Sequence, residues 1–331
     1  MNILITSNKG FEREIFFPVH IMEAIKKLGN VTLNDTEIPF SEDDLANIIQ
    51  DIDICITHWS CPKFSEKVLE NAGRLKMIAH AAGSVAYLIT DPVYERGIKV
   101  CSANSVMAEY VAEGALAYIL AGLRLIPQHN NDMKNGKSWE RKLVENRSLL
   151  REKVGLVGLG TVGMYLLELL KPFGVKIKLY DPYVSQTTLE AYPNVQQCSL
   201  DETLSWGNII SIHASMTPET WHLIDKDKLK LIKDNALFIN TARGAIIDEA
   251  ALINELQIGR FSAVLDVFEK EPFDPNSALR NLENVILMPH MAGATAKEEM
   301  TQAMIEEIER FIKHEPLKYE IPFNKYKLMT R

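Results

Sequence analysis

The stretch Val154-Gly155-Leu156-Val157-Gly158-Leu159-Gly160-Thr161-Val162-Gly163 places a glycine turn with the spacing G-x-G-x-x-G directly after a short apolar strand pattern. Gly158 lets the chain turn sharply out of the strand, and Gly160 leaves room for a pyrophosphate against the backbone. Gly163 lets the next helix pack closely on the sheet. That helix would point its N-terminal amides at the phosphates. The stretch therefore predicts a strand, turn and helix that bind a dinucleotide.

A second apolar strand pattern follows that helix and ends in Lys178-Leu179-Tyr180-Asp181. Asp181 lies 18 residues after Gly163, about where an acidic residue accepts hydrogen bonds from an adenosine ribose. Its negative charge would repel the 2′-phosphate of NADP, so we expect NAD as the cofactor. The alternative is a glycine-rich turn with a structural role only. Strand, helix, second strand and terminal acid together favour the dinucleotide site.

Length and composition are typical of a globular protein with two domains. The chain has 331 residues, 47% of them hydrophobic and 24% charged, and one core seldom serves so long a chain. Its 44 acidic residues outnumber 36 basic ones, and no basic block offsets the net charge of −8. This balance argues against nucleic acid or an anionic membrane as the main partner. No apolar run has the length that a membrane span needs, so we expect no membrane segment.

The N-terminal segment and the cysteines favour a cytoplasmic protein. The chain opens with strand-like Met1-Asn-Ile-Leu-Ile-Thr6, without the charged region or cleavage pattern of a signal peptide. The four cysteines form no C-x-x-C pair and no cluster with histidines. We therefore expect reduced thiols, no metal site and a cytoplasmic location.

Residues 1 to about 103 alternate between strand and helix patterns. Apolar strand patterns occur at 2–6, 53–57 and 75–79, with helical patterns at 17–28 and 65–72. This alternation predicts a parallel sheet covered by helices on both faces. We expect the amphipathic helix pattern at 295–314 to return to this first domain.

The alternation resumes after residue 153. Six strands are expected, as a full dinucleotide-binding sheet requires, near 154–158, 176–180, 208–212, 236–240, 262–266 and 285–288. We therefore predict an α/β protein with two doubly wound parallel-sheet domains. A Rossmann-type NAD domain at 104–295 would be inserted into a flavodoxin-like substrate domain formed by 1–103 and 296–331.

The segment between the two patterns points to a partner. Residues 104–125 are apolar on nearly every face. A helix of this kind must be buried all round, between domains or between subunits. The polar stretch 127–150, with Trp139, is either a solvated connector or an arm that reaches a partner subunit.

Polar groups follow expected strand ends in the second domain, where an open α/β sheet places its ligand crevice. Arg243 comes after a buried strand and suits bidentate binding of a small carboxylate, or else a surface salt bridge. Asp266, Glu269 and Glu271 follow the next strand along the chain. Such a set usually forms a solvated loop, but one of these carboxylates beside a histidine would orient its ring and raise its pKa.

His290 is the histidine best placed for acid–base chemistry. It follows Pro289 at a strand end and precedes a small-residue loop, which is a poor place for core filling. His58, His80 and His213 also follow strands and are secondary candidates. Reduction of a 2-keto acid needs a cation for the carboxylate and an acid for the ketone oxygen. Arg243 and His290 fit these roles, and in the oxidation direction neutral His290 would take the hydroxyl proton.

The ordered motifs resemble those of the D-isomer-specific 2-hydroxyacid dehydrogenases, the superfamily of phosphoglycerate, formate and glyoxylate/hydroxypyruvate dehydrogenases. The similarity covers nearly the whole chain, and its most specific parts are 157–163, 180–182, 239–244, 265–272 and 289–293. The resemblance implies that Arg243 binds the substrate carboxylate. It also implies that His290 is the acid/base and that Glu271, rather than Glu269, pairs with it.

The same resemblance implies which residues touch the cofactor. Besides the glycines of the turn, Thr161 and Val162 would lie at the pyrophosphate and Asp181 at the ribose. Residues of the later motifs would line the nicotinamide end, namely Thr241, Ala242, Asp266 and Gly293. The resemblance also implies a dimer, formed through the helix and arm at 104–150.

The chain departs from the family in the first domain. Where the family usually has a loop like R-x-G-x-G-x-D-N, this chain has His80-Ala81-Ala82-Gly83-Ser84-Val85-Ala86-Tyr87. Backbone amides at Ala82, Gly83 and Ser84 can still hold a substrate carboxylate, because they need no particular side chain. His80, Ser84 and Tyr87 change the shape and polarity of the pocket, so the substrate does not follow from common members. A second departure is Gly114, which stands where the family frequently has the histidine of a V-A-E-H segment.

The sequence thus predicts a cytoplasmic, homodimeric, NAD-dependent oxidoreductase. It would transfer a hydride between the nicotinamide and C2 of a small D-2-hydroxy acid or 2-keto acid, in a cleft between its domains. One alternative is a non-catalytic, NAD(H)-responsive binding module, similar to some transcriptional corepressors of this fold. Another is a dehydrogenase of the same fold that acts on a phosphonate or another substrate that is not a 2-hydroxy acid.

Overall fold

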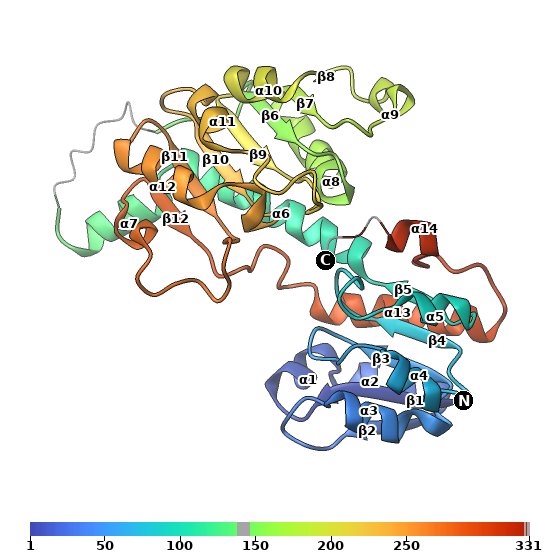
Figure 1. Cartoon of the computed structure of the whole chain (residues 1–331). Helices are drawn as coiled ribbons and strands as arrows, with labels where there is room; N and C mark the ends of the chain where they lie inside the picture. The colour runs from blue at the N-terminus through green and yellow to red at the C-terminus, as the bar shows by residue number, and fades with distance from the viewer. Residues whose placement is uncertain (138–145, 328, 330–331) are drawn as a thin grey trace. The chain divides into compact units, whose positions relative to one another are not determined.

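The computed structural model describes residues 1–137, 146–327 and 329, and its elements form two compact units (Figure 1). Unit 1 comprises Met1–Met107 and Thr295–Arg331, and unit 2 comprises Ala108–Ala294. Unit 2 is therefore inserted into the chain of unit 1.

Among the described residues of unit 1, a five-stranded parallel sheet forms the centre, with the strand order β2-β1-β3-β4-β5. Its strands are β1 (Asn2–Asn8), β2 (Asn30–Asn34), β3 (Ile54–Thr57), β4 (Met77–His80) and β5 (Lys99–Ser102). This order is that of flavodoxin-like folds, which confirms the predicted fold class. The sequence patterns missed β2 and β5. Both are edge strands, and an edge strand tolerates the polar residues that hide its apolar alternation.

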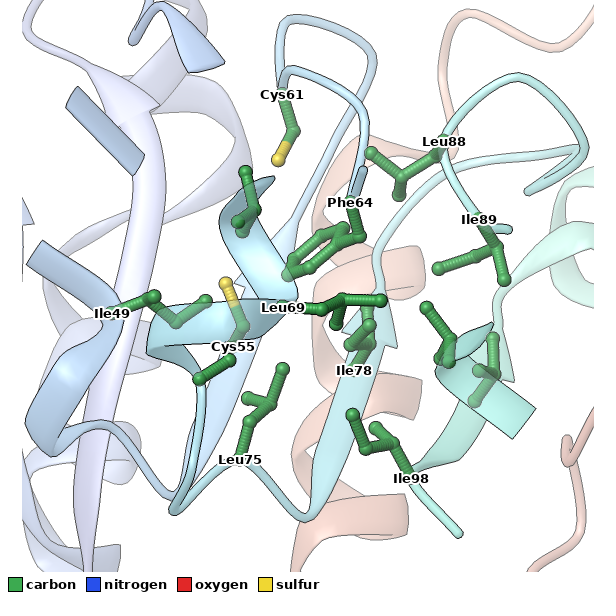
Figure 2. Packing of buried hydrophobic residues seen from close by; sticks show 14 of the residues in the cluster. Ile49, Cys55, Cys61, Phe64, Leu69, Leu75, Ile78, Leu88, Ile89 and Ile98 are labelled. Atoms are coloured by element: carbon green, nitrogen blue, oxygen red, sulfur yellow. The ribbon is translucent and has the colours of Figure 1, made fainter. Parts of the chain in front are cut away.

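Helices cover both faces of this sheet. They are α1 (Phe11–Phe16), α2 (Val19–Leu28), α3 (Glu42–Ile48), α4 (Glu66–Asn71), α5 (Asp91–Glu95), α13 (Lys297–Ile312) and α14 (Phe323–Tyr326). Residues of α3, α4 and α5 bury one face in a hydrophobic cluster that contains Phe64, Leu69 and Ile78 (Figure 2). Helices α1 and α2 contact α13, which also contacts β4 and β5. The C-terminal helix therefore completes unit 1.

The sheet of unit 2 has seven parallel strands among the described residues, in the order β12-β11-β10-β9-β6-β7-β8. They are β6 (Lys153–Val157), β7 (Lys176–Tyr180), β8 (Val195–Gln197), β9 (Ile209–Ile212), β10 (Leu237–Asn240), β11 (Ser262–Leu265) and β12 (Val285–Leu287). Numbered from β6, this is the Rossmann order 3-2-1-4-5-6 with one more strand at the edge. The prediction of six strands is corrected to seven. The missed β8 has three residues at a sheet edge, and only Val195 is apolar.

Two hydrophobic clusters flank this sheet. The helices of unit 2 are α7 (Ile126–Lys134), α8 (Thr161–Leu170), α9 (Gln186–Glu190), α10 (Leu200–Trp206), α11 (Lys226–Leu231) and α12 (Glu249–Ile258), together with most of α6 (Asn104–Leu123). Residues of α6 and α8 share one cluster with the sheet. Residues of α10, α11 and α12 share the other. The sheet is thus doubly wound, as predicted.

Helix α6 corrects one expectation and leaves another open. Among the residues that the structure describes, it is the one helix long and apolar enough, by length and composition, to cross a membrane, so the expectation that no apolar run has this length is wrong. Its buried residues, such as Ala115 and Ile119, belong to a core cluster of unit 2, as in a core helix of a globular domain. Within the single chain its burial is incomplete, because Glu109, Glu113 and Ala117 form an exposed stripe, so burial on all faces stays a prediction that requires a partner subunit. Of the expected arm at 127–150, Trp139 lies outside the described residues.

Candidate active site

The predicted site residues of unit 2 all follow carboxyl ends of its strands. Gly158 follows β6, Asp181 follows β7, Thr241 follows β10, Asp266 follows β11, and His290 lies three residues after β12. Because the strands are parallel, these ends lie along one edge of the sheet, where open α/β sheets bind their ligands.

Gly158 makes the turn that leads from β6 into α8. Its φ of 90° is in the left-handed region, and a Cβ there would overlap the backbone of Ala214, so only glycine fits. Its N–H donates to the Tyr180 carbonyl at 2.8 Å. Helix α8 then begins at Thr161 without a side-chain cap. Uncapped first-turn amides at the positive end of a helix suit a pyrophosphate.

Asp181 ties the glycine turn to the end of β7. One carboxylate oxygen accepts the Leu159 N–H at 2.6 Å, and the other accepts the Tyr183 N–H at 2.8 Å. A carboxylate can accept about four hydrogen bonds, so acceptor capacity remains for a ribose. Its bonds to the turn could not be foreseen from the sequence.

Thr241 presents a polar atom that suits a bound group. Its Oγ1 is buried and has no hydrogen-bond partner among the described residues, and such groups are rare unless a ligand or water satisfies them. The buried Asn240 side chain shapes this segment, since its Oδ1 accepts from Ala242 N at 3.0 Å and its Nδ2 donates to the Arg243 carbonyl at 3.0 Å. The uncapped α8 fits the pyrophosphate at the centre of a dinucleotide, and the unpartnered Thr241 hydroxyl fits a group at one of its ends.

His290 and Glu271 form a hydrogen-bonded pair. The His290 Nδ1 lies 2.8 Å from Glu271 Oε2, and Glu271 Oε1 accepts the Phe268 N–H at 3.1 Å. Glu269 instead lies beside His222, with 3.1 Å between Oε1 and Nε2. The bare sequence left the choice between Glu269 and Glu271 open, and the geometry selects Glu271. The pairing of His222 gave no signal in the sequence.

The backbone at His290 is held in an uncommon conformation. Its φ is 55°, which costs a residue with a side chain about 1–3 kcal/mol unless its surroundings hold it. Asp266 supplies that hold: its carbonyl accepts the His290 N–H at 2.8 Å, and its carboxylate accepts from Met291 N at 2.8 Å and Ala292 N at 3.0 Å. Asp266 therefore fixes the segment that carries His290, a contact that the sequence motif did not reveal. Gly293 follows in the same turn.

Arg243 is half-buried and near the pair. Its Nη1 donates to the Ala242 carbonyl at 2.7 Å. Burial lowers the pKa of the guanidinium, and the charge of Glu271 opposes that shift. Arginine stays protonated in proteins, so the site contains a fixed cation close to Glu271. The structure thus pairs Glu271 with His290 and places Arg243 within electrostatic range of Glu271.

The loop Ala82-Gly83-Ser84 follows β4 in unit 1. Ala82 and Gly83 are buried and Ser84 is half-buried. The Ser102 hydroxyl donates to the Gly83 carbonyl at 2.5 Å, a bond that fixes the loop over the strand ends. Of the side chains that distinguish this loop, Tyr87 is 41% exposed.

The secondary histidine candidates are buried and neutral. Burial, together with His58, lowers the pKa of His80 to about 3, and its Nδ1 lies 2.8 Å from Thr57 Oγ1. Burial, together with the charge of Lys297, lowers the pKa of His58 to about 4. Burial lowers the pKa of His213 to about 4, and its Nε2 lies 2.7 Å from Ser211 Oγ. None of the three is protonated near neutral pH, so none supplies a cation there.

Residues 116–292 match the model of the D-isomer specific 2-hydroxyacid dehydrogenase, NAD binding domain. A hydroxypyruvate reductase of Thermotoga maritima is 32% identical over 308 residues, which cover 90% of this chain and 98% of the relative. A D-lactate dehydrogenase of Aquifex aeolicus, solved with NAD and lactic acid, has a TM-score of 0.73 and 26% identity, with 95% and 96% of the two chains covered. The chain belongs to the D-isomer specific 2-hydroxyacid dehydrogenase family, and unit 2 contains its NAD-binding domain.

Some relatives are longer than this chain. A D-3-phosphoglycerate dehydrogenase of Methanocaldococcus jannaschii is 33% identical over 301 residues, which cover 90% of this chain but 57% of the relative. This chain therefore spans little more than half the length of that relative, and the activity of the whole protein is a matter for proposal.

Proposed function

We propose that this protein is an NAD-dependent oxidoreductase that transfers a hydride between the nicotinamide and C2 of a small D-2-hydroxy acid or 2-keto acid. The supporting observation is the 2.8 Å contact between His290 Nδ1 and Glu271 Oε2, beside the Arg243 cation, at the strand ends of an NAD-binding sheet. Bound NAD would supply the hydride acceptor, and NADH the donor.

In this proposal His290 is the acid/base. An ionised Glu271 can only accept a hydrogen bond, so Nδ1 carries the proton and Nε2 is the nitrogen that serves the substrate oxygen. During reduction Nε2–H would give its proton to the ketone oxygen, and during oxidation neutral Nε2 would take the hydroxyl proton. Glu271 would stabilise the imidazolium form.

Two groups would hold the substrate carboxylate. The Arg243 guanidinium can bind both carboxylate oxygens in one plane. Backbone amides of Ala82, Gly83 and Ser84 would hold it from unit 1, which is then the substrate domain. For the cofactor we propose the pyrophosphate at Gly158, Gly160, Thr161, Val162 and Gly163, the ribose at Asp181, and the nicotinamide end at Thr241, Ala242, Asp266 and Gly293.

The test is NADH oxidation with a panel of 2-keto acids: glyoxylate, hydroxypyruvate, pyruvate, branched and aromatic keto acids, and phosphohydroxypyruvate. We expect turnover of at least one of them, with NADH preferred to NADPH. NADH binding without any turnover would favour the binding-module alternative. If no keto acid is turned over, reduction of NAD with a phosphonate as substrate would favour the second alternative.

We also propose that the protein works as a cytoplasmic homodimer through α6 and α7. Helix α7 has no buried residue, and Ile126 and Met133 are each 54% exposed. A nine-residue helix is marginal in water by itself, so burial of these side chains against a partner subunit would stabilise it. Light scattering should give twice the chain mass. All four cysteines are free thiols in the structure, in keeping with a reducing compartment.

A further inference from the structure

Helix α6 reaches the His290 segment from two positions one helical turn apart, both within unit 2: directly at Gly114, and through Asp266 at Tyr118. At Gly114 a Cβ would lie 2.5 Å from the Ala292 carbonyl oxygen and 2.9 Å from Ala292 Cα. Backbone atoms cannot yield as a flexible side chain does, so any larger residue at this position must displace either the helix or the 290–292 segment. Residues four apart share one face of a helix, and the second contact comes from Tyr118.

The Tyr118 hydroxyl donates to Asp266 Oδ1 at 3.2 Å. The same Oδ1 accepts the Met291 N–H, and Oδ2 accepts the Ala292 N–H. Asp266 is only 1% exposed, and a buried carboxylate needs such donors to offset its lost hydration. Tyr118 is therefore the side-chain donor in a network whose other donors are backbone amides of the His290 segment.

The environment of Tyr118 keeps its proton in place. Burial, and then the charge and hydrogen bond of Asp266, raise the pKa of the Tyr118 phenol well above its usual value. A hydroxyl that keeps its proton makes this contact a fixed hydrogen bond rather than a path for proton transfer.

We infer that Tyr118 and Gly114 are positioning residues for His290: α6 holds the 290–292 segment through the Asp266 carboxylate and the Ala292 backbone. The kinetic part of this inference rests on the proposed function, because the acid/base role of His290 does. The geometric part, that removal of either contact moves His290, does not rest on it.

The test compares Tyr118→Phe with Tyr192→Phe. Tyr192 is the matched control, because its hydroxyl also bonds a carboxylate of unit 2, Glu168 at 2.6 Å, away from the His290 segment. Loss of one hydrogen bond to a charged group costs a free energy that corresponds to a roughly tenfold or larger change in a rate or equilibrium constant. We expect Tyr118→Phe to lower kcat roughly tenfold, with the KM of the keto acid and the Kd of NADH within about twofold of wild type. Tyr192→Phe should leave kcat unchanged.

Gly114→Ala disturbs the contact with the Ala292 backbone, and it should likewise lower kcat while leaving the KM of the keto acid nearly unchanged. The second readout is independent of turnover: the imidazole Cε1–H signal of His290 in a ¹H–¹³C NMR spectrum, assigned with His290→Asn. We expect this signal to shift in Tyr118→Phe and Gly114→Ala, but not in Tyr192→Phe. An unmoved signal in Tyr118→Phe and Gly114→Ala overturns the inference, as does an equal shift in the Tyr192→Phe control. Failure of the wild type to turn over any keto acid would instead overturn the proposed function, and the NMR comparison would still decide the geometric link.

Discussion

Glu271 fixes the ring of His290: the Glu271 Oε2 atom lies 2.8 Å from His290 Nδ1, while Oε1 is held by the Phe268 amide. A carboxylate anchored at one oxygen by the backbone has little freedom to turn away from the imidazole. Beside an ionised carboxylate Nδ1 would carry the imidazole proton, which leaves Nε2 for the proton exchange that we propose.

Replacement of His290 by Asn should remove the proton donor. General acid–base catalysis contributes on the order of 10²–10⁴ in rate, so we expect kcat to fall by that amount. NADH should still bind, because the glycine turn and Asp181 are untouched. Steady-state kinetics with the best keto acid and a fluorescence titration with NADH measure both effects. Undiminished turnover would remove His290 from the mechanism.

Glu271→Gln should lower kcat, because the amide carries no charge to stabilise an imidazolium. Hydrogen bonds to charged groups contribute about 1.5–3 kcal/mol, which corresponds to roughly 10–100-fold in kcat. Glu269→Gln is the matched control two residues away, since Glu269 bonds His222 instead. Equal losses of kcat in the two variants would contradict the assigned role of Glu271.

The contrast between Glu271 and Glu269 shows which features of the site can be predicted from sequence patterns and which cannot. Strand ends, the glycine turn and the placement of Arg243 and His290 follow from periodicity and motif order, because these are local properties of the chain. Which of two glutamates meets His290 depends on how the 266–272 segment folds back on itself, which spacing does not encode. Edge strands such as β8 are also missed by prediction from sequence, because their burial is partial and their apolar pattern is short.

Tyr118 was hidden for a related reason. In an apolar helix its ring looks like core filling, and the bond to Asp266 joins residues 148 positions apart. The burial of His58 and His80 was hidden as well, because a histidine after a strand can face solvent, a ligand or the core. The packing of Phe16 on His58 and of Tyr87 on His80 decides between them.

Arg243→Lys should weaken substrate binding without weakening cofactor binding. A lysine ammonium keeps the charge but cannot form the planar, two-pronged contact with a carboxylate. We expect kcat/KM for the keto acid to fall by roughly 10–100-fold, with the Kd of NADH unchanged. Arg260→Lys, which alters ion pairs with Asp234 and Glu255, is a control for loss of arginine alone. A kcat/KM that stays at the wild-type value would exclude Arg243 as the carboxylate ligand.

Asp181→Asn should shift cofactor preference toward NADPH, because the charge that repels a 2′-phosphate is gone. The amide oxygen can still accept the Leu159 N–H, so the glycine turn keeps its support. Asp181→Ala loses both the charge and the support, and it should also lower the Tm. The ratio of kcat/KM for NADPH to that for NADH should rise in both variants. An unchanged ratio would refute the role of Asp181 at the ribose.

The buried histidines should make the protein sensitive to mild acid. In the unfolded chain a histidine has a pKa of about 6.5, whereas burial lowers the pKa of His80 to about 3 and that of His58 to about 4. Below pH 6.5 the unfolded chain binds protons that the folded chain does not, so stability falls as pH decreases toward those values. Each histidine contributes at most about 1.4 kcal/mol per pH unit.

His80→Asn tests this sign. The asparagine side chain can reach Thr57 much as Nδ1 does, but it cannot take up a proton in the unfolded chain. Urea midpoints should therefore fall less steeply between about pH 7 and pH 5 in His80→Asn than in wild type. His129→Asn is the control, because His129 lies on the exposed helix α7 with Asn146 as its partner. A wild-type slope in His80→Asn would mean that His80 is protonated in the folded state, and its neutral, buried assignment would then be wrong.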